Sequence, residues 1–172
     1  DMYQILKQAY EHGKVISVYI NENDPTRCNV GYVAALNENE VAMYMLDEDG
    51  DFEILSVHGI DKIFRIDADG EYEDKLIKAN KLIADKPPEF IYEGGNMIKA
   101  VCEYAKKYDY PIWIAFKGNN EIGPWGKAMN VTDDMITITR LGDPKPCNVS
   151  YILTRQIDYI ACEYKEYHED EE

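Results

Sequence analysis

The stretch Val15-Ile-Ser-Val-Tyr-Ile20 alternates apolar side chains with a period of two, and Pro111-Ile-Trp-Ile-Ala-Phe116 repeats the pattern in the second half of the chain. The two stretches match at three apolar positions, with Ile16, Val18 and Ile20 over Ile112, Ile114 and Phe116. A period of two is typical of a β-strand. Since the pattern occurs in both halves, the sequence indicates an internal repeat.

The segments that follow the two stretches keep the same order. Each copy continues with a glycine that opens an apolar segment, then a polar turn, then another alternating segment: residues 31–36, 37–40 and 41–46 in the first copy, and 126–131, 132–134 and 135–139 in the second. Alternation on both sides of a short polar turn is typical of paired strands. The sequence therefore predicts three matching strands in each copy.

Two further strands are predicted in each copy. The matching positions are Ser56, Ile63 and Ile66 in the first copy and Ser150, Ile157 and Ile160 in the second. In each copy the two isoleucines are three residues apart, which breaks strict alternation. This spacing predicts either a short helical turn or a β-bulge at the start of the last strand.

A helix is predicted before the first strand of each copy. Residues 3–12 and 97–108 carry apolar side chains at helical spacing, and Ile5, Leu6 and Ala9 match Val101, Cys102 and Ala105. Asn96 is the expected N-cap of the second helix. A third helix is predicted over residues 74–84 and is stopped by Pro87-Pro88.

Prolines and paired glycines in residues 85–95 predict a linker between the copies. We therefore expect two domains, residues 1–86 with a leading and a trailing helix, and residues 87–172 with a leading helix and an acidic tail. Short strands must hide their edges, either by closing into a barrel or by pairing with a neighbour. The expected fold is mainly β with short helices, as two tandem five-stranded, bent, antiparallel barrels.

The order of one helix and five strands resembles the Sm-like (LSm, Hfq-type) family of small β-barrels. Residues 15–46 follow the spacing of the family's first motif, with Gly31 where its second strand bends. Val57-His58-Gly59 resembles the start of the second motif, where an aliphatic residue, an arginine and a glycine are usual. The resemblance implies rings or partial rings in which the fourth strand of one barrel pairs with the fifth of the next. Generic SH3-like barrels would give a similar pattern.

The chain departs from the family at the positions that hold uridine or adenine. Ala42 and Thr137 stand near the position where the family usually has an asparagine. His58 replaces the arginine of the second motif, and residues 151–154 lack its glycine. These departures argue against nucleotide binding through the family's usual pocket.

The charge balance also disfavours general affinity for nucleic acids. The chain has 18 Lys plus Arg against 33 Asp plus Glu, a net charge of −15, and this charge repels phosphate backbones. Residues 163–172 are expected to form a solvated acidic tail. Without a long apolar run or a secretion signal, and with four separated cysteines, we expect a cytoplasmic protein with no membrane partner.

No catalytic, cofactor or metal site is predicted. The histidines and cysteines are not at metal-ligand spacing, and the glycine of Asp47-Glu-Asp-Gly-Asp51 is wrongly placed for a calcium loop. An acidic turn with Gly50 at positive φ is expected there instead. The sequence has neither a nucleophile elbow nor a phosphate-binding glycine loop. We therefore expect a protein that is not an enzyme.

Five residues are candidates for contact with a ligand or a partner. Asn37 and Asn39 lie in a turn that Sm-like rings direct toward their ligand, and His58-Gly59 forms a predicted tight turn that could present an imidazole to a base. Trp125 precedes Gly126 in a loop-like stretch and is a candidate interface residue.

The function that these observations favour is a non-enzymatic binding or assembly module that forms homo-oligomers or binds another protein. An RNA-binding Sm-like protein is the alternative. That alternative predicts that the basic residues Lys62, Arg65, Arg140 and Arg155 gather on one face despite the acidic total.

Overall fold

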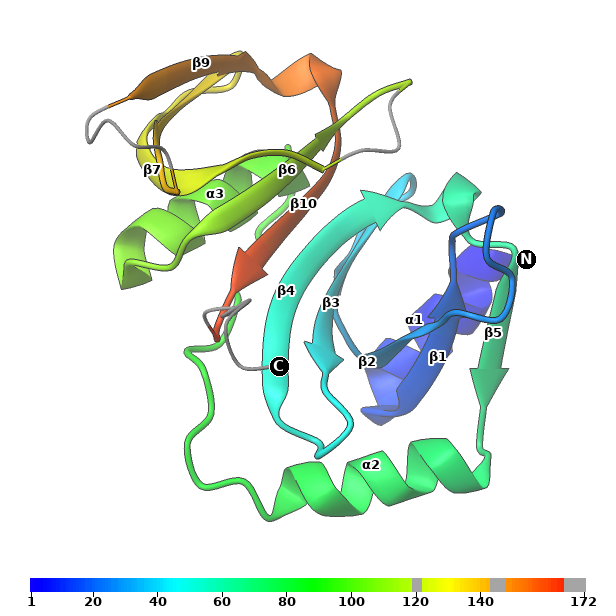
Figure 1. The fold of residues 1–172 in the computed structure, drawn as a ribbon. Helices are drawn as coiled ribbons and strands as arrows, with labels where there is room; N and C mark the ends of the chain where they lie inside the picture. The colour runs from blue at the N-terminus through cyan, green and yellow to red at the C-terminus, as the bar shows by residue number, and fades with distance from the viewer. Residues whose placement is uncertain (119–121, 143–147, 166–172) are drawn as a thin grey trace.

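The fold is mainly β, and the computed structural model describes residues 1–118, 122–142 and 148–165 (Figure 1). The helices are α1 (Met2–His12), α2 (Glu71–Lys81) and α3 (Met97–Tyr108), with two short 3₁₀ turns, η1 (Ile60–Lys62) and η2 (Thr154–Gln156). The strands are β1 (Val15–Tyr19), β2 (Asn29–Leu36), β3 (Glu40–Leu46), β4 (Phe52–Gly59), β5 (Arg65–Ala68), β6 (Ile112–Phe116), β7 (Ile122–Val131), β8 (Met135–Arg140), β9 (Val149–Leu153) and β10 (Ile157–Glu163).

All the strands belong to one antiparallel sheet. Their order is β5-β1-β2-β3-β4-β10-β6-β7-β8-β9. The first half contributes β5-β1-β2-β3-β4 and the second half contributes β10-β6-β7-β8-β9. In each half the fifth strand is therefore followed by the first, second, third and fourth, so the two halves have the same strand order. The predicted β-rich halves with leading helices are confirmed, but within the described residues neither half closes into a barrel. The sheet instead continues across the chain because β4 pairs with β10.

The local predictions are confirmed at several places. α3 has the predicted bounds, and the side chain of Asn96 accepts a hydrogen bond from the Lys99 N–H at 3.1 Å. Both copies enter their last strand through a 3₁₀ turn that ends one residue before Ile63 or Ile157, so the predicted helical turn is present in both. In the second copy the β10–β6 pairing also shifts its register between Ile157 and Tyr159, as a β-bulge does. α2 begins before its predicted start because Gly70 precedes a first turn rich in acidic side chains, which a helix N-terminus favours.

A glycine lies at a crowded position in the second strand of each half. A Cβ on Gly31 would lie 1.9 Å from the Tyr44 carbonyl oxygen, and one on Gly126 would lie 2.2 Å from the Thr139 carbonyl oxygen. Both distances are far below van der Waals contact, so neither position can hold a side chain without a shift of the neighbouring strand. The glycine therefore allows close approach of the third strand in both halves.

The interiors of the two halves lie on opposite faces of the sheet. Along β4, Ile54 packs with the first-half cluster of Leu6, Ile16, Val18, Val41, Met43 and Met45. The alternate residues Leu55 and Val57 pack in the largest cluster, which also contains α3 and the second-half residues Ile112, Ile114, Ile136, Ile138, Ile152, Ile160 and Cys162. A single core therefore joins the outer side of the first half to the inside of the second.

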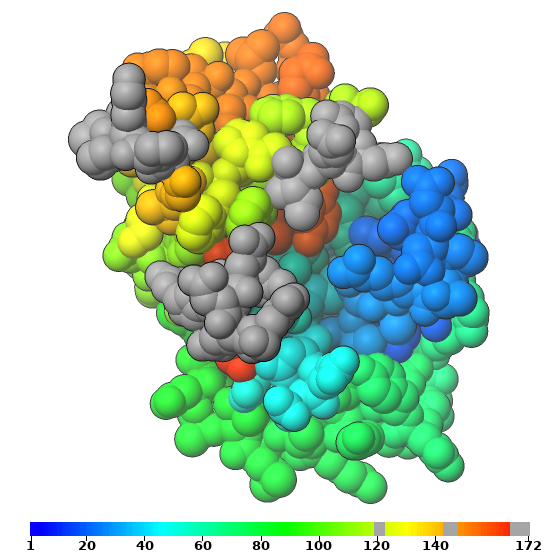
Figure 2. All heavy atoms as spheres, viewed as in Figure 1, coloured from blue at the N-terminus to red at the C-terminus, as the bar shows by residue number. Residues whose placement is uncertain are grey.

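The segment that connects the halves (residues 82–96, the connecting segment) is held at its centre by β3 and α3. Phe90 is buried, its N–H donates to the Tyr44 hydroxyl at 2.7 Å, and the Tyr104 hydroxyl donates to the Pro88 carbonyl at 2.6 Å. The space-filling view shows the first half, blue to cyan, in contact with the second, yellow to red (Figure 2). The predicted boundary between two domains thus falls in a segment from which Phe90 enters the shared core.

Candidate functional site

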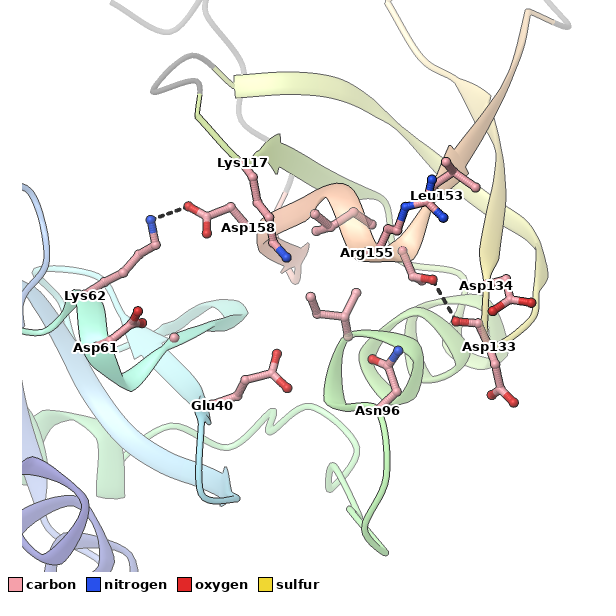
Figure 3. A pocket seen from close by; sticks show the side chains of 14 residues that line it. Glu40, Asp61, Lys62, Asn96, Lys117, Asp133, Asp134, Leu153, Arg155 and Asp158 are labelled. Atoms are coloured by element: carbon pink, nitrogen blue, oxygen red, sulfur yellow. Dashed lines mark hydrogen bonds and ion pairs between the residues drawn. The ribbon is translucent and has the colours of Figure 1, made fainter.

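A cleft lies where turns of the two halves meet (Figure 3). Its volume is about 760 Å³. The first half contributes the start of β3 and the turn from Gly59 through η1, and the second half contributes η2, the β7–β8 turn, Lys117 after β6 and the start of α3. Because the two halves repeat one another, the cleft brings together equivalent turns from both copies.

Carboxylates outnumber cations in the cleft lining. The carboxylates are Glu40, Asp61, Asp133, Asp134 and Asp158, and the cations are Lys62, Lys117 and Arg155. Lys62 forms an ion pair with Asp158 at 2.5 Å, across the junction of the two halves. Figure 3 shows the Lys117 ammonium and the Glu40 carboxylate extending into the space between the halves. The excess of negative charge makes the cleft a poor site for a phosphate backbone.

His58 lies beside this cleft but does not line it. The predicted exposed turn is wrong, because His58 is within β4, pairs with Val41 and Tyr159 on the flanking strands, and is only 1% exposed. Neither ring nitrogen has a hydrogen-bond partner within the described residues. Burial, and then the Lys62 ammonium, lower the pKa of His58 to about 4, while Asp158 acts in the opposite direction. The ring is therefore neutral at pH 7 and cannot stack on an incoming base in this conformation.

Gly59 lines the cleft, whereas Asn37 and Asn39 hold the neighbouring turn. The Asn37 side-chain oxygen accepts the backbone N–H groups of Asn39 at 2.9 Å and Glu40 at 2.7 Å. The Asn39 carbonyl accepts the N–H of Ile60 at 2.9 Å, so the β2–β3 turn is attached to η1. These asparagines position Glu40 and Gly59 at the cleft instead of lining it.

Trp125 makes its contacts inside the second half. Its ring stacks on Trp113 with centroids 5.2 Å apart, and its Nε1–H donates to a Glu163 carboxylate oxygen at 3.1 Å. Glu163 is the last residue of β10 and is buried, so the expected solvated tail does not begin there. The rest of that predicted tail, from residue 166, lies outside the described residues, as does Cys147.

The basic residues of the RNA-binding alternative are divided between sites. Lys62 and Arg155 line the cleft. Arg65 is on the edge strand β5, where its guanidinium pairs with Asp67 at 2.9 Å and lies over the Tyr19 ring. Arg140 is at the end of β8, opposite Gly126. Two of the four residues therefore share a surface with several carboxylates.

The titratable groups of the described residues do not assemble a recognisable reaction centre. Cys102 and Cys162 are buried, and burial raises the pKa of both thiols, so they remain protonated at neutral pH. A search of the described residues finds no group of three His, Cys, Asp or Glu side chains placed to hold a metal ion. Nor does any described helix combine the length and apolarity needed to cross a membrane.

Sequence reasoning missed most of the cleft. Lys117, Asp133 and Asp158 are far apart in the chain and follow no known motif. The available signal was the repeat itself, since the turn at 37–40 aligns with 132–134 and η1 aligns with η2. Once the pairing of β4 with β10 is known, equivalent turns of the two halves can be expected to lie close together at one end of the sheet.

Comparisons with known proteins give no further identification. A scan against protein-family models, a search of curated proteins and a search of solved structures each found no significant match.

Proposed function

We propose that the chain is a non-enzymatic assembly module made of two diverged Sm-like units, and that it associates with further copies of itself through the edges of its sheet. The observation that carries the proposal is the pairing of β4 with β10. Five residue pairs, from Tyr159–His58 to Glu163–Ile54, join the fourth strand of one unit to the fifth strand of the other. The resemblance to Sm-like proteins implies this type of junction between subunits.

The ends of the sheet carry the same two kinds of strand. β5 is a fifth strand and β9 is a fourth strand, and each has a strand partner on one side only within the described residues. Open strand edges tend to pair with another chain. A second copy could therefore repeat at β5 and β9 the junction that β10 and β4 form within the chain.

The internal junction also gives a register for the external one. The repeat aligns Ile66 with Ile160 and Ser56 with Ser150. Applied to the observed β4–β10 pairs, this alignment places Arg65, Ile66, Asp67 and Ala68 of one copy opposite Ile152, Tyr151, Ser150 and Val149 of the next. β9 carries no charged side chain, and Arg65 and Asp67 neutralise one another on β5, so this register has no like-charge repulsion.

The side chains at the open edge favour contact with a partner. Tyr151 is 72% exposed and Val149 is also exposed, although both belong to a strand. Phe64, next to β5, is exposed as well. An interface between different edges is head-to-tail, and it forms a closed ring or an open chain according to the rotation per subunit.

Light scattering coupled to size exclusion tests the assembly. We expect a mass greater than that of one chain, and we expect Tyr151→Lys to shift the protein to the monomer because it places a charge at the edge. Tyr72→Lys is the matched control, since Tyr72 is an exposed tyrosine on α2. A wild-type protein that is monomeric at micromolar concentration, or that ignores Tyr151→Lys, would contradict the proposal.

Cysteine cross-linking tests the register. In a background with Cys28 and Cys147 replaced by serine, a mixture of Ile66→Cys and Tyr151→Cys proteins should form a covalent heterodimer on oxidation. The mixture of Ala68→Cys and Tyr151→Cys is the displaced control and should cross-link far less. Equal cross-linking of both mixtures would contradict the stated register.

RNA binding is the alternative, and the specific observation in its favour is that Lys117 and Arg155 at the cleft have no ion-pair partner within the described residues. Five carboxylates in the same lining oppose it. Retention on immobilised RNA at low and moderate salt separates the two functions. Salt-sensitive retention that is lost in Lys117→Ala would favour the alternative.

A further inference from the structure

A second hollow lies between α1 and the connecting segment, and it shares no lining residue with the cleft. We refer to it as the tyrosine groove, and its volume is about 480 Å³. One wall is the face of α1 that bears Tyr3, Lys7 and Tyr10, which are four and three residues apart and so lie on one side of the helix. The floor is β2 with Tyr44, and the other wall is the connecting segment from Glu89 to Tyr92.

The groove is lined by aromatic rings with accessible surfaces. Tyr3, Tyr10, Tyr44 and Tyr92 surround it, and Tyr10 is 53% exposed. Ile91 on the opposite wall is 69% exposed. Ala34 and Ala35 on the floor have short side chains, so a ligand backbone can approach the sheet. Such a surface offers rigid apolar contacts together with hydroxyl groups, at a low entropic cost.

Beside the groove the protein holds an extended, proline-containing segment of its own. The connecting segment passes through Pro87-Pro88 without helix or strand structure. It is held by two tyrosine hydroxyls, with Tyr104 donating to the Pro88 carbonyl and Tyr44 accepting from the Phe90 N–H. The Phe90 and Tyr104 rings meet edge to face at 5.6 Å. Tyr44 therefore both fixes this segment and lines the groove, whereas Tyr104 lines the neighbouring hollow on the α3 side.

The charged side chains of the groove favour a ligand with a positive charge. Glu11 and Glu89 stand on opposite walls, against the single cation Lys7. All three side chains are exposed, and the chain carries a net charge of −15. A basic residue in the ligand would be attracted at long range and could lie between the two carboxylates.

We propose that the tyrosine groove binds an extended, proline-containing segment of a partner protein that also carries a basic residue. Aromatic-lined grooves suit the polyproline II conformation because this helix is preformed and loses little entropy on binding. The ligand would lie along β2, with its prolines against Tyr10 and Tyr44 and its basic residue near Glu11 and Glu89. The site is separate from the edges β5 and β9, so it does not depend on the assembly proposed above.

Fluorescence anisotropy tests the proposal. The probe is a labelled synthetic peptide with two Pro-X-X-Pro repeats and a terminal arginine, titrated with the full chain. We expect saturable binding that weakens about tenfold in Tyr10→Ala, the loss typical of a central aromatic contact. Tyr72→Ala is the matched control, because Tyr72 is 45% exposed on α2 and lies outside the groove. Tyr10 is exposed, so its removal should leave the thermal unfolding midpoint and the oligomeric mass unchanged.

Peptide variants test the ligand chemistry. Replacing the prolines with alanine should weaken binding about tenfold, and replacing the arginine with glutamate should weaken it further in low salt. The variant Glu11→Lys should reduce the preference for arginine over glutamate. Absence of saturable binding, equal binding of the alanine peptide, or equal binding by Tyr10→Ala would each overturn the proposal.

Discussion

The two halves have the same strand order but different neighbours. In the first half the outer residues of the fourth strand, Leu55 and Val57, are fully buried, because β10 pairs with that strand and α3 packs in the same cluster. The corresponding residues of the second half are Val149 and Tyr151, and both are exposed. The same alternation therefore gives a core in one half and an open surface in the other, according to what lies next to it.

A second difference lies at the end of the fourth strand. His58 in the first half aligns with Ile152 in the second, and both are buried. The isoleucine fits an apolar interior, whereas the imidazole has two ring nitrogens without hydrogen-bond partners in the described part of the chain. One half therefore carries a titratable group at a position where its repeat carries none.

The largest expected effect tests what the halves share. Gly31→Ala and Gly126→Ala should each lower the free energy of unfolding by on the order of 4 kcal/mol, because the added Cβ would overlap a backbone carbonyl oxygen. Chemical denaturation monitored by circular dichroism measures both changes. Gly13→Ala is the control, since it has positive φ but open space, and it should cost only about 1 kcal/mol. If only one of the two strand glycines mattered, the halves would not share this close approach of the third strand.

The next effect tests the difference at His58. The folded pKa is about 4, below the ordinary value of 6.5, so the unfolded chain binds more protons between these values and stability falls as the pH drops from 6.5 to 4. The loss due to this group should reach about 3 kcal/mol at pH 4. His58→Ile, which copies the second half, should remove that part of the pH dependence. Urea denaturation of both proteins at several pH values measures it, and identical slopes would contradict the assignment.

A smaller effect concerns the tryptophan pair, which is specific to the second half. Trp125→Phe should cost about 1 kcal/mol of unfolding free energy, because it retains an aromatic ring over Trp113 but removes the Nε1–H donor to Glu163. Trp113→Phe keeps the stack and the donor, so it is the matched control. Equal losses in both variants would assign the effect to stacking alone. Thermal unfolding measures the two changes.

The smallest effect concerns the ion pair across the junction. Lys62 and Asp158 are both partly exposed, so a double-mutant cycle with Lys62→Ala and Asp158→Ala should give a coupling energy of about 0.5 kcal/mol. The coupling should decrease at high salt. A coupling of several kcal/mol would mean that this pair, and not the β4–β10 ladder, dominates the junction.

Much of the fold could be predicted because its signals are local. Alternation identified the strands, and helical spacing and Asn96 identified α3. The three-residue spacing from Ile63 to Ile66 and from Ile157 to Ile160 identified an irregularity at the start of each last strand. Gly50 has φ of 83°, as the acidic turn required. Each of these features depends on residues that are close in sequence.

The wrong predictions share one physical cause. His58 before a glycine was assigned to an exposed turn, but it lies within β4 against a strand from the other half. Glu163 was assigned to the acidic tail, although β10 continues to it. The cleft was missed for the same reason, since its turns come together only when β4 and β10 pair.

By itself the sequence determined a duplicated order of one helix and five strands, because side-chain periodicity is a property of neighbouring residues. The tertiary structure alone decided that β10 joins the halves, that Val57 is buried while Tyr151 is exposed, and that β5 and β9 remain as edges. Strand pairing uses backbone groups that every residue has, so the local pattern contains no record of which edge meets which.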